Sequence, residues 1–102
     1  MAGYTLTPLA RKDLDDIWTY TVGQWNEEQA ERYMREIEAA ILAVTDNPNL
    51  GRMCDEIRSG YFKIPSGSHM IFYRLIQKKI NIVRILHQRM DAGHHLQQRE
   101  SE

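Results

Sequence analysis

The stretch NIVRILHQRMD, residues 81–91, decides the fold, and its two halves differ in character. The first half is rich in isoleucine and valine, whose branched side chains favour extended backbone, so it predicts a buried strand. The second half ends in arginines and a histidine. Such an ending is typical either of an active site or of a surface that binds a partner.

Two further β-like runs precede this strand. The three runs are IRSGYFKIP at 57–65, SHMIFYRLI at 68–76 and INIVRILHQ at 80–88. Short connections, PSG at 65–67 and QKK at 77–79, predict that the strands are antiparallel neighbours. The register of the last pair stays open. A two-residue loop puts Tyr73 and Arg84 on one face, whereas a three-residue loop puts Phe72 beside Arg84.

Two helices are predicted ahead of these strands. A short strand, GYTLTP, leads into a helix that starts at Pro8, a residue suited to the first helical turn, and ends near Gly23. The sequence NEEQ from Asn26 is a capping box that opens a second helix, which ends at Asn47-Pro48. The short linker QWN between the two helices predicts an antiparallel hairpin.

Together these segments predict an α+β fold, with a single domain over residues 1–102. An N-terminal strand and an antiparallel helical hairpin pack on a small antiparallel β-sheet, and a short C-terminal tail follows. The hairpin covers one face of the sheet, and no further segment is predicted to cover the other. Because that second face is part apolar and part basic, we expect it to be an interaction surface.

Charge is distributed unevenly along the chain, although the formal net charge is only -1. Residues 1–56 carry 5 basic and 11 acidic side chains, a net of -6, and residues 57–102 carry 8 basic and 3 acidic side chains, a net of +5. Residues 57–90 contain seven cations and no carboxylate. This half should present a positive potential that favours an anionic partner, either nucleic acid or an acidic protein segment.

Several classes of protein and of site are disfavoured. Cys54 is the single cysteine, so no internal disulfide can form, and neighbouring carboxylates would raise the pKa of its thiol. The N-terminus lacks the apolar core of a signal peptide, and no apolar run approaches the roughly 20 residues of a membrane span. The four histidines lack zinc-ligand spacing, and no phosphate-binding loop is present. We therefore expect a cytoplasmic protein with no metal, no cofactor and no membrane contact.

A histidine and several cations could converge at the strand ends. RNA cleavage beside a 2′-hydroxyl needs a base, an acid and cations for the developing phosphorane charge. The residues that could supply them are His87, Arg58, Lys63, Arg74, Arg84 and Tyr73. In the favoured alternative, His87 is a strand-end hydrogen-bonding residue and the cations are solvated or pair with an acidic partner. Trp25, in the helix linker, either plugs the end of the hairpin or is an exposed contact residue.

Four blocks follow one another in order: TPLARKDLDDIW at 7–18, NPNLGRMCDEIRSGY at 47–61, PSGSHMIFYR at 65–74 and VRILHQRMD at 83–91. With them the chain resembles, over residues 4–96, the ParE toxins of bacterial type II toxin–antitoxin systems. The resemblance implies the RelE/ParE-like fold, which these toxins share with RelE-type ribosome-dependent endoribonucleases.

The resemblance also implies a function without catalytic residues. ParE toxins inhibit DNA gyrase and so block replication, and a cognate antitoxin, ParD-like or another DNA-binding antitoxin, neutralises them by wrapping a C-terminal segment over the toxin. The toxin alone is not expected to bind DNA sequence-specifically. RelE-like cleavage of messenger RNA is the alternative, and a plain single-strand nucleic-acid-binding module ranks last.

Candidate contact residues follow from the same resemblance. For gyrase we expect the end of the last strand and the segment after it, namely His87, Arg89, Met90 and Asp91. For the antitoxin we expect Leu14, Ile17, Trp18 and Tyr33 along the hairpin, with Arg58, Lys63, Arg74 and Arg84 on the sheet.

Overall fold

The computed structural model describes residues 3–97. In chain order the elements are β1 (Tyr4–Leu6), α1 (Pro8–Gln24), α2 (Glu27–Asp46), the 3-10 turn η1 (Pro48–Leu50), β2 (Arg52–Met53), β3 (Phe62–Ser66), β4 (His69–Ile76), β5 (Lys79–His87) and α3 (Ala92–Gln97). The predicted α+β fold is confirmed, although the sequence pattern predicts neither β2 nor α3. The end of the tail, residues 98–102, lies outside the described residues. None of the helices in the described part has the length and apolar character that a bilayer crossing requires.

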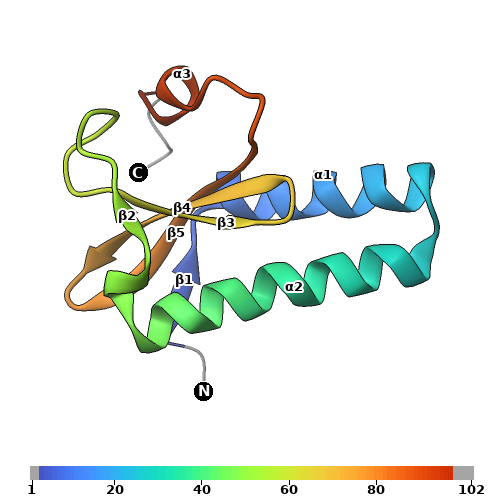
Figure 1. Cartoon of the computed structure of the whole chain (residues 1–102), viewed down its shortest axis with the longest axis horizontal. Helices are drawn as coiled ribbons and strands as arrows, with labels where there is room; N and C mark the ends of the chain where they lie inside the picture. Colours follow the sequence, from blue (N-terminus) through green and yellow to red (C-terminus); the bar gives the residue numbers. More distant parts are fainter. Residues whose placement is uncertain (1–2, 98–102) are drawn as a thin grey trace.

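The strands form one mixed sheet in the order β1-β5-β4-β3-β2 (Figure 1). β3, β4 and β5 pair antiparallel as predicted, and β2 adds an antiparallel edge beside β3. β1 is parallel to β5 and pairs Tyr4 with Ile80. Thr7 extends this pairing, because its N–H donates to the Ile82 carbonyl at 3.0 Å and its hydroxyl donates to the Val83 carbonyl at 2.7 Å. In the chain, the two helices of the hairpin follow β1 and precede the other strands. They form part of the long crossover connection that a parallel strand pair requires.

The register of β4 and β5 combines the two alternatives. Gln77 and Lys78 have φ angles of 52° and 70°, the left-handed values of a tight two-residue hairpin turn, so the loop is the shorter one. A bulge then shifts the register, because Tyr73 pairs with Ile82 while Phe72 pairs with Arg84. The loop length is therefore that of the first alternative, whereas the pairing of Phe72 with Arg84 is that of the second, because β5 has one extra residue at the bulge.

Both predicted helix starts are confirmed by their caps. The Thr7 hydroxyl accepts a hydrogen bond from the Ala10 N–H at 3.0 Å, with Pro8 in the first turn. The Asn26 side chain accepts one from the Gln29 N–H at 2.7 Å. Each cap is worth about 1 kcal/mol of helix stability. The two helices form the expected hairpin and cover one face of the sheet (Figure 1).

The hairpin buries its apolar stripe against that face. The fully or nearly buried members of this core are Ala10, Ile17, Ile37, Ile41 and Val44 from the helices and Ile71, Tyr73, Ile80, Ile82 and Ile85 from β4 and β5. Burying one such aliphatic side chain stabilises the fold by about 1.5–3 kcal/mol relative to leaving it exposed. This packing holds both helices of the hairpin against β4 and β5.

The second face of the sheet is also covered, so the expectation of an uncovered face is wrong. Phe72, Val83 and Leu86 pack there with Cys54 and Tyr61 of the loop between β2 and β3, and with Leu96 of α3. The Arg58 guanidinium fixes α3 by donating to the Leu96 carbonyl at 2.9 Å. Figure 1 shows α3 returning over the strands on the side away from α2. α3 contains only one large aliphatic residue, Leu96, but its side chain is fully buried in the cluster on this face.

Replacing Leu96 by alanine should therefore lower the free energy of unfolding by about 2–4 kcal/mol, because it leaves a cavity between α3 and the sheet. Urea unfolding followed by circular dichroism measures the change. Leu75→Ala is the matched control, since Leu75 is 43% exposed, and it should cost less than about 0.5 kcal/mol. Equally small effects at both positions would mean that α3 does not pack on the sheet in solution.

Candidate functional site

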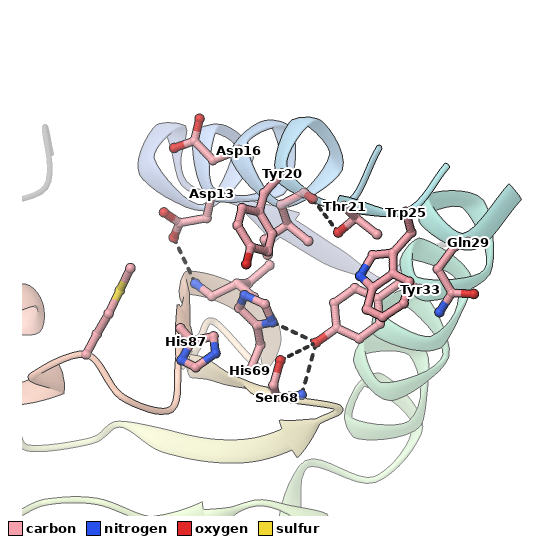
Figure 2. A pocket seen from close by; sticks show the side chains of 13 residues that line it. Asp13, Asp16, Tyr20, Thr21, Trp25, Gln29, Tyr33, Ser68, His69 and His87 are labelled. Carbon is pink, nitrogen blue, oxygen red and sulfur yellow. Dashed lines mark hydrogen bonds between the residues drawn. The ribbon is translucent and has the colours of Figure 1, made fainter. Parts of the chain in front are cut away.

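A groove of about 580 Å³ lies between the hairpin and the ends of β4 and β5 that carry His69 and His87 (Figure 2). Its walls are Asp13, Asp16, Ile17, Tyr20 and Thr21 of α1, Trp25 of the linker, Gln29 and Tyr33 of α2, Ser68, His69, Ile85 and His87 of the sheet, and Met90 after β5. This site, hereafter the hairpin groove, has the size and the mixed apolar and polar lining of a binding site.

Tyr33 ties α2 to the turn between β3 and β4 at one end of the hairpin groove. Its hydroxyl lies 2.6 Å from Nδ1 of His69, accepts a hydrogen bond from the Ser68 N–H at 3.1 Å and donates to the Ser66 carbonyl at 3.2 Å. The turn can approach so closely because Gly67 has no side chain: a Cβ there would collide with the Tyr33 ring. Gly67 also has a φ of 58°, where glycine is favoured.

His69 and His87 face each other across β4 and β5. The two residues are cross-strand partners, and their rings meet edge to face with centroids 5.3 Å apart. Nδ1 of His87 accepts a hydrogen bond from the Arg89 N–H at 3.1 Å, which places the ring proton of neutral His87 on Nε2. Burial lowers the pKa of His69 below its ordinary 6.5, and His87 lowers it further, whereas Asp13 raises it. His69 is therefore uncharged at neutral pH.

Asp13 joins α1 to β5 beneath the groove. Its carboxylate accepts two hydrogen bonds from the Arg84 guanidinium, at 2.9 and 3.0 Å, and a third from the Ile85 N–H at 2.9 Å. The side chains of Arg84 and Asp13 are only 10% and 11% exposed. A bidentate pair that also satisfies a backbone N–H is well suited to burial, because few polar atoms are left unpaired.

Three of the other predicted cations, Arg58, Lys63 and Arg74, lie on the second face of the sheet. Arg58 and Arg74 both lie over the ring of Tyr61, with their guanidinium carbons 5.5 and 5.9 Å from its centroid. Arg74 also donates to the Asn81 side chain at 2.9 Å. Lys63 lines a second cavity, of about 210 Å³, which shares His87 and Met90 with the hairpin groove.

Neither a metal site nor a reactive thiol is found in the described part of the chain. Within residues 3–97 no group of three or more histidine, cysteine or acidic side chains could hold a metal ion. Cys54 is buried, and burial followed by the charge of Glu56 raises the pKa of its thiol. Because the thiolate is the reactive form, this environment disfavours a nucleophile.

The comparisons with known proteins agree with this geometry. Residues 4–92 match the family model described as the ParE toxin of type II toxin-antitoxin system, parDE. The chain belongs to the ParE toxin family.

Relatives with the same family name cover nearly the whole chain. This ParE chain is 48% identical over 94 residues to Toxin ParE1 of Mycobacterium tuberculosis strain H37Rv, covering 91% of this chain and 96% of the relative. It is 44% identical over 96 residues to Toxin ParE1 of Caulobacter vibrioides strain CB 15, covering 94% and 99%. A structure described as the chromosomal ParDE TA system from P. aeruginosa has the same fold, with a TM-score of 0.74, 22% identity, and coverage of 85% of this chain and 96% of that one.

The ParE fold brings together some of the sequence-predicted site residues and separates others. Ile17 and Tyr33 were predicted to contact the antitoxin, and His87 and Met90 to contact gyrase. All four line the hairpin groove. Leu14 packs against the hairpin core, and neither it nor half-buried Trp18 lines the groove.

The remaining candidates lie apart from these. Arg89 and Asp91 are exposed beside Met90, and Asp91 accepts a hydrogen bond from the His94 N–H at 3.2 Å at the start of α3. Arg58, Lys63 and Arg74 are on the second face, and Arg84 is held in the pair with Asp13. Their contacts with partners stay predictions.

The groove also contains residues that the sequence did not single out. Asp16, Tyr20 and Gln29 lie on helix faces that the sequence pattern predicts to be exposed to solvent. The groove that they line forms only when the helices pack on the sheet. The pairing of His69 with His87 could not have been found from the turn alone, because the two-residue turn would set His69 opposite Leu86 and only the bulge moves it opposite His87. Trp25 is 71% exposed, so of its two interpretations the plug is wrong.

Replacing Asp13 by asparagine should lower the free energy of unfolding by about 3–5 kcal/mol, because Arg84 would keep its buried charge without the carboxylate. Chemical denaturation measures the loss. Asp15→Asn removes the same charge from an exposed position of α1 and should change stability by no more than about 0.5 kcal/mol. A similar small change in Asp13→Asn would show that the pair does not join α1 to β5.

The lowered pKa of His69 predicts how stability depends on pH. As the pH falls through 6.5, the unfolded chain takes up a proton at His69 before the folded protein does. The free energy of unfolding should therefore decrease between pH 6.5 and the lower folded-state pKa, and the His69 part should be fully present above 6.5. Urea titrations from about pH 7.5 to about pH 5 should show a smaller decrease for His69→Gln. The unmodified chain, measured in the same buffers, is the reference for the full decrease.

Proposed function

We propose that this ParE chain inhibits DNA gyrase without catalysing a reaction of its own, and that a cognate ParD-like antitoxin neutralises it. The observation that supports this most directly is the family match over residues 4–92. A gyrase inhibitor of this kind acts in the cytoplasm. It requires neither a cofactor nor a metal, and it binds no DNA sequence by itself.

The proposed gyrase contact is the segment between β5 and α3. His87, Arg89, Met90 and Asp91 are consecutive or nearly so, and the last three are exposed. The segment carries a cation, an anion and a 48% exposed methionine within three residues. A short exposed segment held at both ends by β5 and α3 suits a rigid binding epitope, since little conformational entropy is lost when it binds.

The proposed antitoxin contact includes the hairpin residues Leu14, Ile17, Trp18 and Tyr33 and the sheet residues Arg58, Lys63, Arg74 and Arg84. Ile17 and Tyr33 support it best, because both line the hairpin groove. Arg84 would take part only at its edge, since the guanidinium is already paired with Asp13.

Messenger-RNA cleavage is less well supported by the positions of the cations. Arg58 and Arg74 are engaged with Tyr61, and Arg58 also binds the Leu96 carbonyl beneath α3. Of the groove-lining residues in the described part of the chain, none is a lysine or an arginine. Within the hairpin groove His69 and His87 therefore lack the cation that a phosphorane transition state requires, and Lys63 lines only the second cavity, which His87 also borders.

The purified chain should block supercoiling by gyrase and trap linear, cleaved DNA, and the antitoxin should reverse both effects. Met90→Ala and Arg89→Ala should weaken the inhibition about tenfold or more without changing stability, because both side chains are exposed in the proposed contact. Lys79→Ala, an exposed change at the far end of β5, is the control.

The alternative is tested in parallel by adding the same protein to ribosomes that translate a defined messenger RNA. Full gyrase activity together with cut messenger RNA would overturn the proposal. Loss of both activities in His87→Ala, with folding intact, would assign His87 to a target contact or to catalysis.

A further inference from the structure

The second face of the sheet carries a row of four cations, each from a different segment of the chain. Arg52 of β2 is directly opposite Lys63 of β3. Lys63 is in turn opposite Phe72 of β4, and Arg74, two residues further along that strand, lies on the same face as Phe72. Arg58, from the loop after β2, lies beside Arg74, because both guanidiniums lie over the ring of one tyrosine. These four residues, hereafter the cationic row, are Arg52, Arg58, Lys63 and Arg74.

The cationic row is not neutralised by the rest of the described fold. None of its members makes an ion pair with a carboxylate of residues 3–97. The loop after β2 carries two exposed carboxylates, Asp55 and Glu56, and that of Asp55 accepts a hydrogen bond from the Gly60 N–H at 2.8 Å. Like charges directly opposite each other destabilise a sheet, yet the register sets Arg52 against Lys63. An anion from outside the chain would relieve this repulsion.

The members of the cationic row keep hydrogen-bond donors for such an anion. Arg58 donates to the Leu96 carbonyl, and Arg74 donates through Nε to the Asn81 side chain, each at 2.9 Å. A guanidinium has five N–H donors, so each arginine has others to offer. Arg52 is exposed and Lys63 is half-buried. Charged donors of this kind bind phosphate oxygens well, and arginine can do so with two hydrogen bonds at once.

Burial of the neighbouring aromatic rings favours a phosphate backbone over an acidic peptide. Tyr61 and Phe72, which lie on the same face as the cationic row, are only 3% and 2% exposed. A protein segment laid along the row would therefore gain little contact with these rings. Protein partners draw most of their binding energy from a few buried anchors such as aromatic side chains, whereas a phosphate backbone binds through charge and the release of counterions.

The cationic row is also continuous with the proposed gyrase contact. Lys63 lines the second cavity together with His87 and Met90, which both belong to that contact. Gyrase acts on DNA, so the enzyme holds a duplex when the toxin traps it. A toxin bound to gyrase through the segment after β5 would present the adjacent row of cations to its surroundings on the complex.

We propose that the cationic row contacts the phosphate backbone of the DNA that gyrase holds, without reading its sequence. This inference rests on the proposed function, because it adds a second partner to the complex with gyrase. Three members of the row, Arg58, Lys63 and Arg74, also belong to the proposed antitoxin contact. An antitoxin that covers them would exclude the DNA.

The first test measures the concentration of full-length chain that gives half-maximal trapping of cleaved DNA by purified gyrase. Arg52→Gln and Lys63→Gln should each raise this concentration about three- to tenfold, and each should make its logarithmic dependence on salt less steep by about one. Arg35→Gln is the matched control, since it removes an exposed cation from α2 on the other face. It should trap DNA as the unmodified chain does.

The second test places a photoactivatable azidophenacyl group on a cysteine introduced by Arg52→Cys. The native Cys54 is fully buried and should not react. On illumination of the complex with gyrase and labelled DNA, the group should cross-link to DNA. The same group introduced by Arg35→Cys should not. Thermal melts of all variants should match that of the unmodified chain, because Arg52 and Arg35 are exposed and Lys63→Gln relieves a like-charge contact.

The outcomes distinguish this inference from the proposed function. Unchanged trapping and salt dependence in Arg52→Gln and Lys63→Gln, or cross-links from position 52 to gyrase alone, would overturn the DNA contact and leave gyrase inhibition standing. Weaker antitoxin binding with unchanged trapping would instead assign the cationic row to an acidic antitoxin segment. Cross-links to messenger RNA in a ribosome reaction, without cross-links to DNA, would assign it to RNA. Failure of the unmodified chain to trap DNA would contradict the proposed function, and this inference with it.

Discussion

Strand β5 is enclosed on every side, and the rest of the molecule is arranged around that constraint. Its residues from Ile80 to Leu86 are all buried, and β4 pairs along its whole length. On the other edge β1 pairs with Ile80 to Ile82, and Asp13 accepts the Ile85 N–H. Burial of both faces requires a layer on each side, which the hairpin and α3 supply. The charged side chain of Arg84 can be buried in this strand because its guanidinium donates two hydrogen bonds to the Asp13 carboxylate.

The two layers give the molecule two surfaces of different character. Over one face, the linker end of the hairpin, at Trp25, borders a groove with exposed aromatic residues and with Asp16 among its lining. Over the other, Arg58 and Arg74 surround Tyr61 next to α3. The segment that includes His87 and Met90 borders both cavities, so one strand end connects two surfaces that differ in charge. A partner that wraps around the protein would have to change its own chemistry from one side to the other.

Local patterns predicted most of the elements, because each depends on neighbours in sequence. Thr7, Pro8 and Asn26 start the helices through contacts within three residues, and the apolar runs of β4 and β5 are long enough to recognise. α3 escaped prediction because six residues with one buried leucine carry little helical periodicity. Its position is set by Arg58, which is 38 residues away from Leu96.

The site was less predictable, since its geometry depends on pairs that are distant in sequence. Asp13 and Arg84 are 71 residues apart, and no spacing rule joins them. The bulge that sets Phe72 opposite Arg84 is likewise a compromise between the turn and the two cores. Net charge was misleading for a related reason: it counted cations along the chain, whereas packing decides which of them a ligand can reach.

The parallel pairing of β1 with β5 has a consequence for how the chain is synthesised. The strand β1 is made before β5, and Thr7 can bond the carbonyls of Ile82 and Val83 only after those residues, up to 76 positions later, have been made. Closure of so long a loop is slow compared with the formation of the helices. Until β5 has been made, the Asp13 carboxylate of α1 lacks its Arg84 partner and β1 lacks its neighbouring strand.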